Sequence, residues 1–219
     1  MPAASFNELR HRLWAHWRCK LLLLVGLTVV FSVPYIYFAN HPVFQPRDLP
    51  LTWLDRAAGF DPRWVWVYQS VYLLTGSLPW LAKTREHLRR YVWGFAYLTT
   101  ASFLIFILFP VRCPRELIEQ PSAMYRLLML YDGPYNAMPS LHVGFLFYTL
   151  CFIWRVRAPL PRITWAILIG WSLLIAWSTL ATKEHYAMDL LVGIAFGWIA
   201  DLAAWSRMLR MSGETSQSG

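Results

Sequence analysis

The chain has 219 residues, of which 57% are hydrophobic and 15% are charged, and its formal net charge is +8. This balance excludes a water-soluble helical domain, because too little polar sequence remains to cover its surface. The positive charge does not indicate nucleic-acid binding, since the basic residues flank apolar runs in the pattern of a membrane protein.

Residues 1–20 are basic and aromatic. Leu13, Trp14 and Trp17 recur at a helical spacing, so this segment is predicted to lie on the cytoplasmic surface of the membrane. The apolar run that follows resembles a secretion signal, but Phe31–Tyr37 continues it without a small-x-small cleavage site. We therefore expect this run to remain in the protein as its first span.

Six apolar runs are long enough, or nearly so, to cross a bilayer core of about 30 Å, which takes about 20 residues. They are Leu21–Phe38, Trp64–Leu81, Tyr91–Val111, Leu141–Val156, Ile163–Ala181 and Met188–Trp205. The sequence predicts an all-α integral membrane protein, with six transmembrane helices in one bundle formed by residues 21–209. Residues 210–219 are rich in serine and glycine and are predicted to be a disordered tail.

The distribution of basic residues sets the expected orientation. With a cytoplasmic amino terminus, most of the 20 Lys and Arg residues fall on the inner side, as the positive-inside rule requires. Both termini are then cytoplasmic. The expected location is the plasma membrane (the inner membrane of a bacterium), with the outer segments facing the periplasm. Those outer segments carry Arg47, Arg56, Arg63, Arg112, Arg115, Arg126 and Lys183.

The outer segments hold little regular structure. Residues 40–63 contain four prolines, so a folded cap is expected there and not a long helix. Ser122–Tyr131 is predicted to be a short surface helix, and Asp132-Gly133-Pro134 is typical of a turn. Arg112 and Arg115 follow the third run; they are either snorkelling residues or, since topology does not favour positive charge outside, ligands for an anion.

The first polar motif is Tyr135-Asn136-Ala137-Met138-Pro139-Ser140-Leu141-His142. Proline and serine suit the start of a helix, where Ser140 can act as the N-cap. The free backbone N–H groups of such a helix start can bind an anion. His142 would lie on the first turn, next to that anion.

The second motif is His185-Tyr186-Ala187-Met188-Asp189. His185 and Asp189 are four residues apart, so on a helix the carboxylate can accept from the imidazole. Gly193 and Gly197 continue the same face and permit another helix to approach closely. An ionisable pair at the edge of the hydrocarbon is costly, which favours a functional role.

Together the two motifs resemble the signatures of the type 2 phosphatidic acid phosphatase superfamily over residues 110–200. Ser178, His185 and Asp189 match its Ser-Arg-x5-His-x3-Asp element, and Pro139–His142 resembles its Pro-Ser-Gly-His element. The residues of both motifs resemble most closely those of the branch that contains inositol phosphorylceramide synthases and their bacterial relatives.

The sequence departs from the family at its basic positions. Thr179 stands where the family has arginine, and the Lys-x6-Arg-Pro element is absent. Ile105 and Leu108 occupy the lysine positions relative to Arg112 and Arg115. The candidates to replace these phosphate-binding residues are Arg112, Arg115 and Lys183.

The resemblance implies a metal-independent enzyme without a cofactor that acts on a membrane lipid phosphate or diphosphate ester. His185 would attack phosphorus to form a phosphohistidine, with Asp189 fixing its tautomer. His142 would protonate the leaving lipid oxygen and then deprotonate the incoming water. Ser140 and Ser178, with the basic residues, would bind the phosphoryl oxygens.

Three alternatives stay open at this point. The phosphohistidine could pass its group to a lipid alcohol such as ceramide, as in an inositol phosphorylceramide or sphingomyelin synthase. Two histidines and a carboxylate are also a familiar metal-ligand set. A transporter could use its outer histidines only to bind substrate, although no inverted repeats are evident.

Overall fold

The computed structural model describes residues 3–116, 119 and 121–216, and every regular element in this part of the chain is a helix. The only strand-like features there are isolated bridges that join Val111 to Arg47 and to Asn136. The elements are α1 (Ala3–Trp14), α2 (Trp17–Asn40), α3 (Trp53–Ala58), η1 (Pro62–Trp64), α4 (Val65–Gln69), α5 (Val71–Ser77), η2 (Leu78–Leu81), α6 (Arg85–Leu108), α7 (Ala123–Tyr131), α8 (Leu141–Arg155), α9 (Arg162–Ala181) and α10 (Ala187–Ser216).

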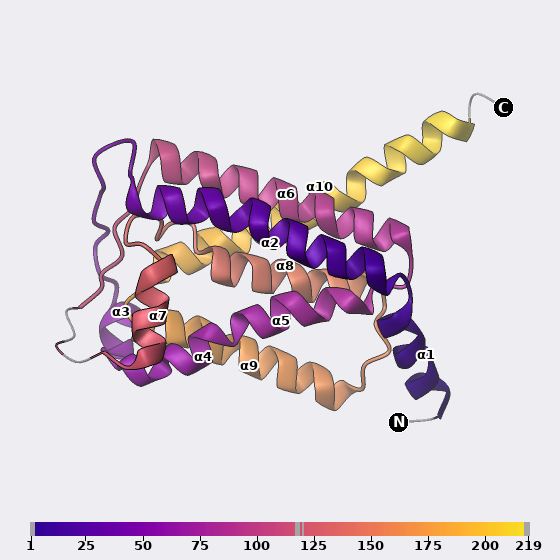
Figure 1. Ribbon diagram of the computed structural model, residues 1–219, viewed down its shortest axis with the longest axis horizontal. Coiled ribbons are helices and arrows are strands. Elements are labelled where there is room, and N and C mark those ends of the chain that lie inside the picture. Colours follow the sequence, from indigo (N-terminus) through magenta and orange to yellow (C-terminus); the bar gives the residue numbers. More distant parts are fainter. Residues whose placement is uncertain (1–2, 117–118, 120, 217–219) are drawn as a thin grey trace.

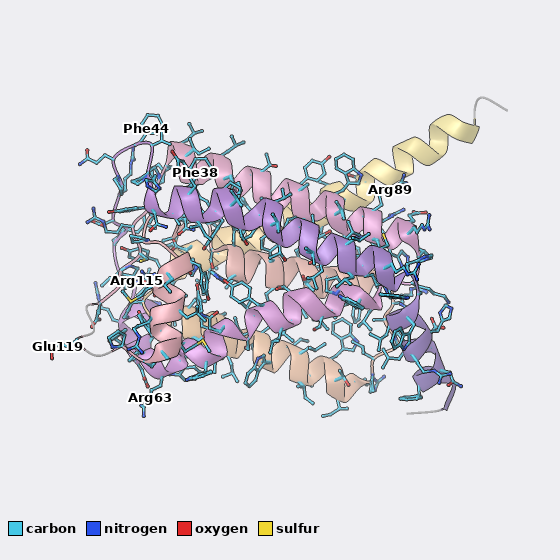
Figure 2. All side chains as sticks on the ribbon, in the orientation of Figure 1. Phe38, Phe44, Arg63, Arg89, Arg115 and Glu119 are labelled. Atoms are coloured by element: carbon cyan, nitrogen blue, oxygen red, sulfur yellow. The ribbon has the colours of Figure 1, made fainter. Side chains whose placement is uncertain are left out.

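The bundle has two distinct ends (Figure 1). Helices α2, α6, α8, α9 and α10 run along its long axis, as does the succession of α4 and α5, while α7 lies across one end. We call this the histidine end, because α8 and α10 begin there, beside His142 and His185. At the far end lie helix α1, Lys20 at the start of α2, and Arg89 near the start of α6. In Figure 2, Arg115 lies beside α7 at the histidine end, and Arg89 lies towards the other end.

Among the described residues, four helices are long and apolar enough to cross a membrane, namely α2, α6, α9 and the Ala187–Ser206 part of α10. The fourth predicted run forms α8, which is apolar but has only 15 residues. The second predicted run, Trp64–Leu81, is not one continuous helix. It breaks at Ser70, whose hydroxyl donates to the Val67 carbonyl at 2.5 Å, and changes to η2 at Pro79, which lacks a backbone N–H.

Helices α6, α8 and α10 form the packed centre of the bundle. A Cβ atom at Gly94 on α6 would overlap the ring of Tyr148 on α8, whose hydroxyl donates to the Tyr91 carbonyl at 3.0 Å. Helix α2 differs, because only 6% of the residues in its most apolar stretch are buried against the rest of the protein. It packs on α6 at the edge of the bundle and leaves most of its surface to the surrounding lipid.

The amino-terminal segment is tied to the far end by buried cations. Lys20 Nζ donates to the carbonyls of Arg12 at 2.5 Å and Trp80 at 2.6 Å. Arg12 in turn donates to the carbonyl of Val156 at 2.9 Å, just after α8. These bonds satisfy carbonyls that a helix end otherwise leaves without partners. The part of this segment that the structure describes, residues 3–20, therefore packs against the bundle.

The remaining segments follow the sequence in part. Helix α7 has Ser122 as its N-cap, which confirms the predicted surface helix. The proline-rich stretch 40–63 is mostly irregular, as expected, although Thr52 and Asp55 form a capping box that supports the short helix α3. Helix α10 continues to Ser216 and so extends into the segment from 210 that was expected to be disordered; Arg210 and Met211 are good helix formers.

Candidate active site

The two signature histidines meet at the histidine end, although 43 positions separate them in the chain. His142 lies on the first turn of α8, and His185 lies two residues before α10 begins. Both side chains are buried, with 6% and 4% of their surface exposed. The predicted encounter of these two imidazoles is therefore present in the fold.

Small residues bring α8 and α10 together. A Cβ atom at Gly193 would clash with the Ser140 carbonyl oxygen, and one at Gly197 would lie 2.6 Å from the Gly144 carbonyl oxygen. The prediction that this glycine pair admits another helix is thus confirmed, and the helix is α8. The backbone N–H of Ser140 also donates to the Asp189 carbonyl at 3.0 Å, so the two motifs share a direct backbone bond.

The hydrogen bonds of the two imidazoles assign their protons. His185 Nδ1 lies 2.8 Å from the carbonyl oxygen of Ala137, which can only accept. Nδ1 therefore carries the proton, and Nε2 of a neutral His185 holds a lone pair. His142 Nδ1 lies 3.2 Å from that Nε2; it donates to a neutral His185 and accepts from a protonated one. A lone pair and a proton thus face each other between the two rings.

Asp189 supports His185 through charge more than through a direct bond. Its Oδ2 accepts from the Tyr186 N–H at 2.8 Å and lies 3.6 Å from His185 Nδ1, a distance that is long for a hydrogen bond. The Ala137 carbonyl is the nearer acceptor, contrary to the expected direct imidazole–carboxylate bond. Burial alone would lower the pKa of His185, but the Asp189 carboxylate outweighs it, and the pKa of His185 is raised above its usual value.

A buried carboxylate, Asp132, stands behind His142. Tyr35 and Tyr68 donate their hydroxyls to its two oxygens at 2.7 and 2.6 Å. The Tyr68 oxygen also lies 3.1 Å from both ring nitrogens of His142, and Asp132 Oδ2 lies 3.9 Å from His142 Nε2. The Tyr72 hydroxyl approaches the same Nε2 at 3.0 Å. A positive charge on His142 would therefore have a fixed counter-ion.

These partners of His142 were not identified from the sequence. Asp132 was interpreted only as part of a turn, because Asp-Gly-Pro is common in turns. One available signal was Tyr68 and Tyr72, which are four residues apart in an apolar run and so share a helix face. A pair of phenols on one face of a span indicates a polar partner, because buried hydroxyls are hydrogen-bonded.

The predicted basic ligands have other partners in the structure. Arg115 makes a two-pronged contact with the buried Glu184 carboxylate and donates to the Asp132 carbonyl at 2.8 Å. Lys183 Nζ donates to the Asp55 carbonyl at 2.7 Å. Arg112 is exposed and lies over the Tyr135 ring. Arg115 thus lies at the rim of the histidine site, whereas Lys183 fastens α3 beside α10.

The two serines among the predicted phosphate ligands differ. Ser178 is fully buried, and its hydroxyl donates back to the Ile175 carbonyl at 2.6 Å. Ser140 occupies the N-cap position of α8, but its side chain makes no capping bond, contrary to the expected role. Its buried Oγ has no hydrogen-bond partner within the described residues, and the same holds for Asn136 Nδ2. These two groups are free to bind an anion.

A long cavity ends at the tyrosines beside His142. It has a volume of about 640 Å³, lies between α2 and α5 against α6, and reaches from Lys20 to Tyr72. A smaller cavity of about 40 Å³ is lined by His142 and shares Phe31, Tyr35 and Tyr72 with the larger one. Access along the bundle is therefore to His142 and not to His185.

In the part of the chain that the structure describes, no three His, Cys, Asp or Glu side chains are grouped so that they could hold a metal ion. The groups that meet at the histidine end are two imidazoles flanked by buried carboxylates. This set fits transfer of a phosphoryl group through nitrogen.

Comparison with known proteins agrees with this interpretation. The family model of the PAP2 superfamily matches residues 43–203, which include both histidines and the carboxylates beside them. Comparison with curated proteins and with solved structures gives no match. Membership of this superfamily indicates a phosphatase or phosphotransferase that acts on phosphate esters. With the match covering most of the chain and both motifs, the protein belongs to the PAP2 (type 2 phosphatidic acid phosphatase) superfamily.

Proposed function

We propose that the protein is a membrane-embedded lipid phosphatase that works through a phosphohistidine on His185. The observation that carries this proposal is the 3.2 Å contact between His185 Nε2 and His142 Nδ1, at the end of an apolar cavity. A lone pair and a proton face each other there, which is the arrangement that displacement at phosphorus requires.

In the first step, the Nε2 lone pair of His185 attacks phosphorus, and the bond from phosphorus to the lipid oxygen breaks. His142 Nδ1 gives its proton to that oxygen, so the lipid leaves as a neutral alcohol. In the second step, a water gives a proton back to His142 and attacks phosphorus, and the N–P bond breaks to release phosphate. The imidazoles must separate for this, because 3.2 Å leaves no room for a phosphoryl group.

The carboxylates have distinct tasks in this scheme. Asp189 stabilises the positive charge that His185 acquires when its Nε2 bonds to phosphorus. Asp132 does the same for protonated His142, with Tyr68 holding it in place. Ser140 Oγ and Asn136 Nδ2 are buried and without partners in the described residues, and we assign them to the phosphoryl oxygens. Arg115 supplies positive charge at the rim.

The direct test is detection of the intermediate. Purified protein in detergent is mixed with a lipid phosphate labelled at phosphorus and then quenched in denaturant. We expect labelled protein whose bond is stable to base and labile to acid, and loss of both label and phosphate release in His185→Ala. A His185→Ala variant that still turns over would refute the nucleophile. Tyr37→Phe, an exposed change on α2, is the control for handling and folding.

A second candidate is transfer of the phosphoryl or phospho-headgroup to a lipid alcohol. The cavity favours it, because it opens at His142, the residue that would deprotonate an acceptor. A chromatographic assay with a lipid phosphate donor, with and without ceramide or diacylglycerol, separates the two activities. A new phospholipid would indicate a transferase, whereas free phosphate alone would indicate a phosphatase.

We further propose six spans, with the broken stretch 65–81 as the second and the short α8 as the fourth. The site then faces the outside of the plasma membrane, and both termini are cytoplasmic, in line with the distribution of Lys and Arg. A cysteine placed at the exposed Arg112 should react with a membrane-impermeant thiol reagent on intact cells. Protection there, with labelling only after lysis, would reverse the orientation.

A further inference from the structure

The cavity beside His142 is long and narrow enough to identify its occupant by shape. Lys20 and Tyr35 both line it and both lie on α2. At about 1.5 Å per residue, they are about 22 Å apart along the helix. That is most of the ~30 Å hydrocarbon core of a bilayer. The cavity therefore extends past the midplane, further than one leaflet.

The walls of this cavity are mainly apolar, from Leu23, Leu27, Phe31, Val92 and Phe95. One wall is α2, which is the least buried of the four long apolar helices found among the described residues. A cavity lined by hydrocarbon side chains suits an alkyl chain, because an apolar wall leaves no polar group of the protein without a partner when the chain occupies it.

Polar groups stand at the two ends. At the far end, Lys20 lines the cavity, and its Nζ is held by two backbone carbonyls. At the histidine end, Gln69 accepts a hydrogen bond from the Tyr131 hydroxyl. The Gln69 Nε2 donor is buried and has no partner among the described side and main chains. Gln69 lines the cavity as well, so a ligand oxygen there would satisfy the donor.

We infer that this cavity holds the hydrocarbon chain of the alcohol that leaves or attacks phosphorus, with the alcohol oxygen at His142. The inference rests on the proposed function and specifies its substrate class. The substrate is a lipid phosphate with a long chain that extends towards Lys20. Gln69 donates a hydrogen bond to an oxygen of the lipid between its phosphate and its hydrocarbon chain. The wall beside Lys20 sets the longest chain that fits, so the enzyme discriminates by chain length.

Gly76 offers a way to shorten the cavity. It lines the wall on α5, and a Cβ atom added there would lie 3.8 Å from Leu24 Cδ1, an ordinary contact. Gly76→Ala is therefore tolerated, whereas the larger side chain of Gly76→Leu must occupy the cavity. Gly26 on α2 has nothing within 4 Å of an added Cβ atom and does not line the cavity. Gly26→Leu is thus a matched control that adds the same side chain outside the cavity.

The experiment measures kcat/KM for octadecyl phosphate and for butyl phosphate in detergent. We expect Gly76→Leu to lose about tenfold or more on the long chain and to keep butyl phosphate hydrolysis within about twofold. Gly76→Ala and Gly26→Leu should match the parent protein on both substrates. Equal losses on both chains, or no loss on the long chain, would overturn the inference while leaving the phosphatase intact. If the parent protein hydrolyses neither ester, the proposed function itself fails.

Added octadecanol separates the leaving alcohol from an attacking one. In either case it should inhibit hydrolysis in the parent protein and inhibit Gly76→Leu at least about tenfold less. Formation of octadecyl phosphate from another phosphate donor would identify the occupant as an acceptor as well. Octadecanol that neither inhibits nor is phosphorylated would refute the cavity as the alcohol site.

Discussion

Asp132→Asn tests the electrostatic support of His142 without a change in side-chain volume. The carboxylate lies 3.9 Å from His142 Nε2. At an effective dielectric constant of about 20, two unit charges at this distance attract by about 4 kcal/mol. If His142 is positively charged when it protonates the leaving oxygen, removing this counter-ion costs up to about a thousandfold in rate. We expect a loss of about 10² to 10³ in kcat/KM for an alkyl phosphate.

The assay compares two leaving groups. An alkoxide needs a proton as it leaves, but nitrophenolate does not, so a nitrophenyl phosphate bypasses the general acid. Asp132→Asn should therefore lose much less activity on the nitrophenyl ester than on the alkyl ester. Tyr35→Phe is the control, because it removes one hydrogen bond to Asp132 and keeps the charge; it should cost less than about tenfold, the effect of about 1.4 kcal/mol.

Two results would refute this reasoning. An equal loss on both esters would show that Asp132 supports the fold or the nucleophile and not the proton donor. Unchanged kinetics would show that His142 does not become charged beside Asp132. The melting temperature of each variant, measured in the same detergent, separates a folding defect from a catalytic one.

Three further predictions concern the other site residues. His185 must be neutral to attack, and its pKa is raised, so activity should decrease as the pH is lowered through that raised pKa. Asp189→Asn removes the carboxylate, so the residual activity of this variant should decrease only at a lower pH. An unchanged pH profile would contradict the assignment. Ser140→Ala loses an Oγ without a partner in the described residues, so the melting temperature should hold while kcat falls about 10²-fold; retained kcat excludes it as a phosphoryl ligand. Arg115→Lys keeps the charge but loses the two-pronged contact with Glu184, so the melting temperature should fall and KM should rise. Arg112→Ala, at an exposed position, should change neither. Equal effects of the two variants would contradict the different roles assigned to these two arginines.

The sequence was most informative where a reactive side chain lies next to residues that define the start of a helix. His142 follows Pro139 and Ser140 at a helix start, and His185 precedes a helix that carries a glycine pair. Each motif thus reports its own local geometry, and close packing of the two helices then brings both histidines together. The encounter of the imidazoles was predicted because both motifs fall on the same face of the predicted bundle and because together they resemble the signatures of the superfamily. The all-helical fold followed from the apolar runs in the same way.

What the sequence did not reveal depends on contacts between distant segments. Asp132 meets Tyr35 and Tyr68, which belong to different helices, and nothing in the local pattern of an Asp-Gly-Pro turn indicates such partners. Arg115 was predicted as a phosphate ligand because it is basic and outside, but its neighbour in space is Glu184. Charge alone could not distinguish a free cation from one held in a buried ion pair.

The absence of the family's usual basic signature changes how negative charge is balanced in this site. Asp132, Glu184 and Asp189 are all buried around it, and Arg115 is already paired with one of them. A phosphate ester that enters adds further negative charge to a region of low dielectric, where unpaired charge is costly. Under the proposed function, a proton gained by the pair of imidazoles as the substrate binds offsets part of this charge, because both rings lie beside buried carboxylates. Binding of the phosphate then supplies the proton that the leaving oxygen needs, since the two rings are in direct contact.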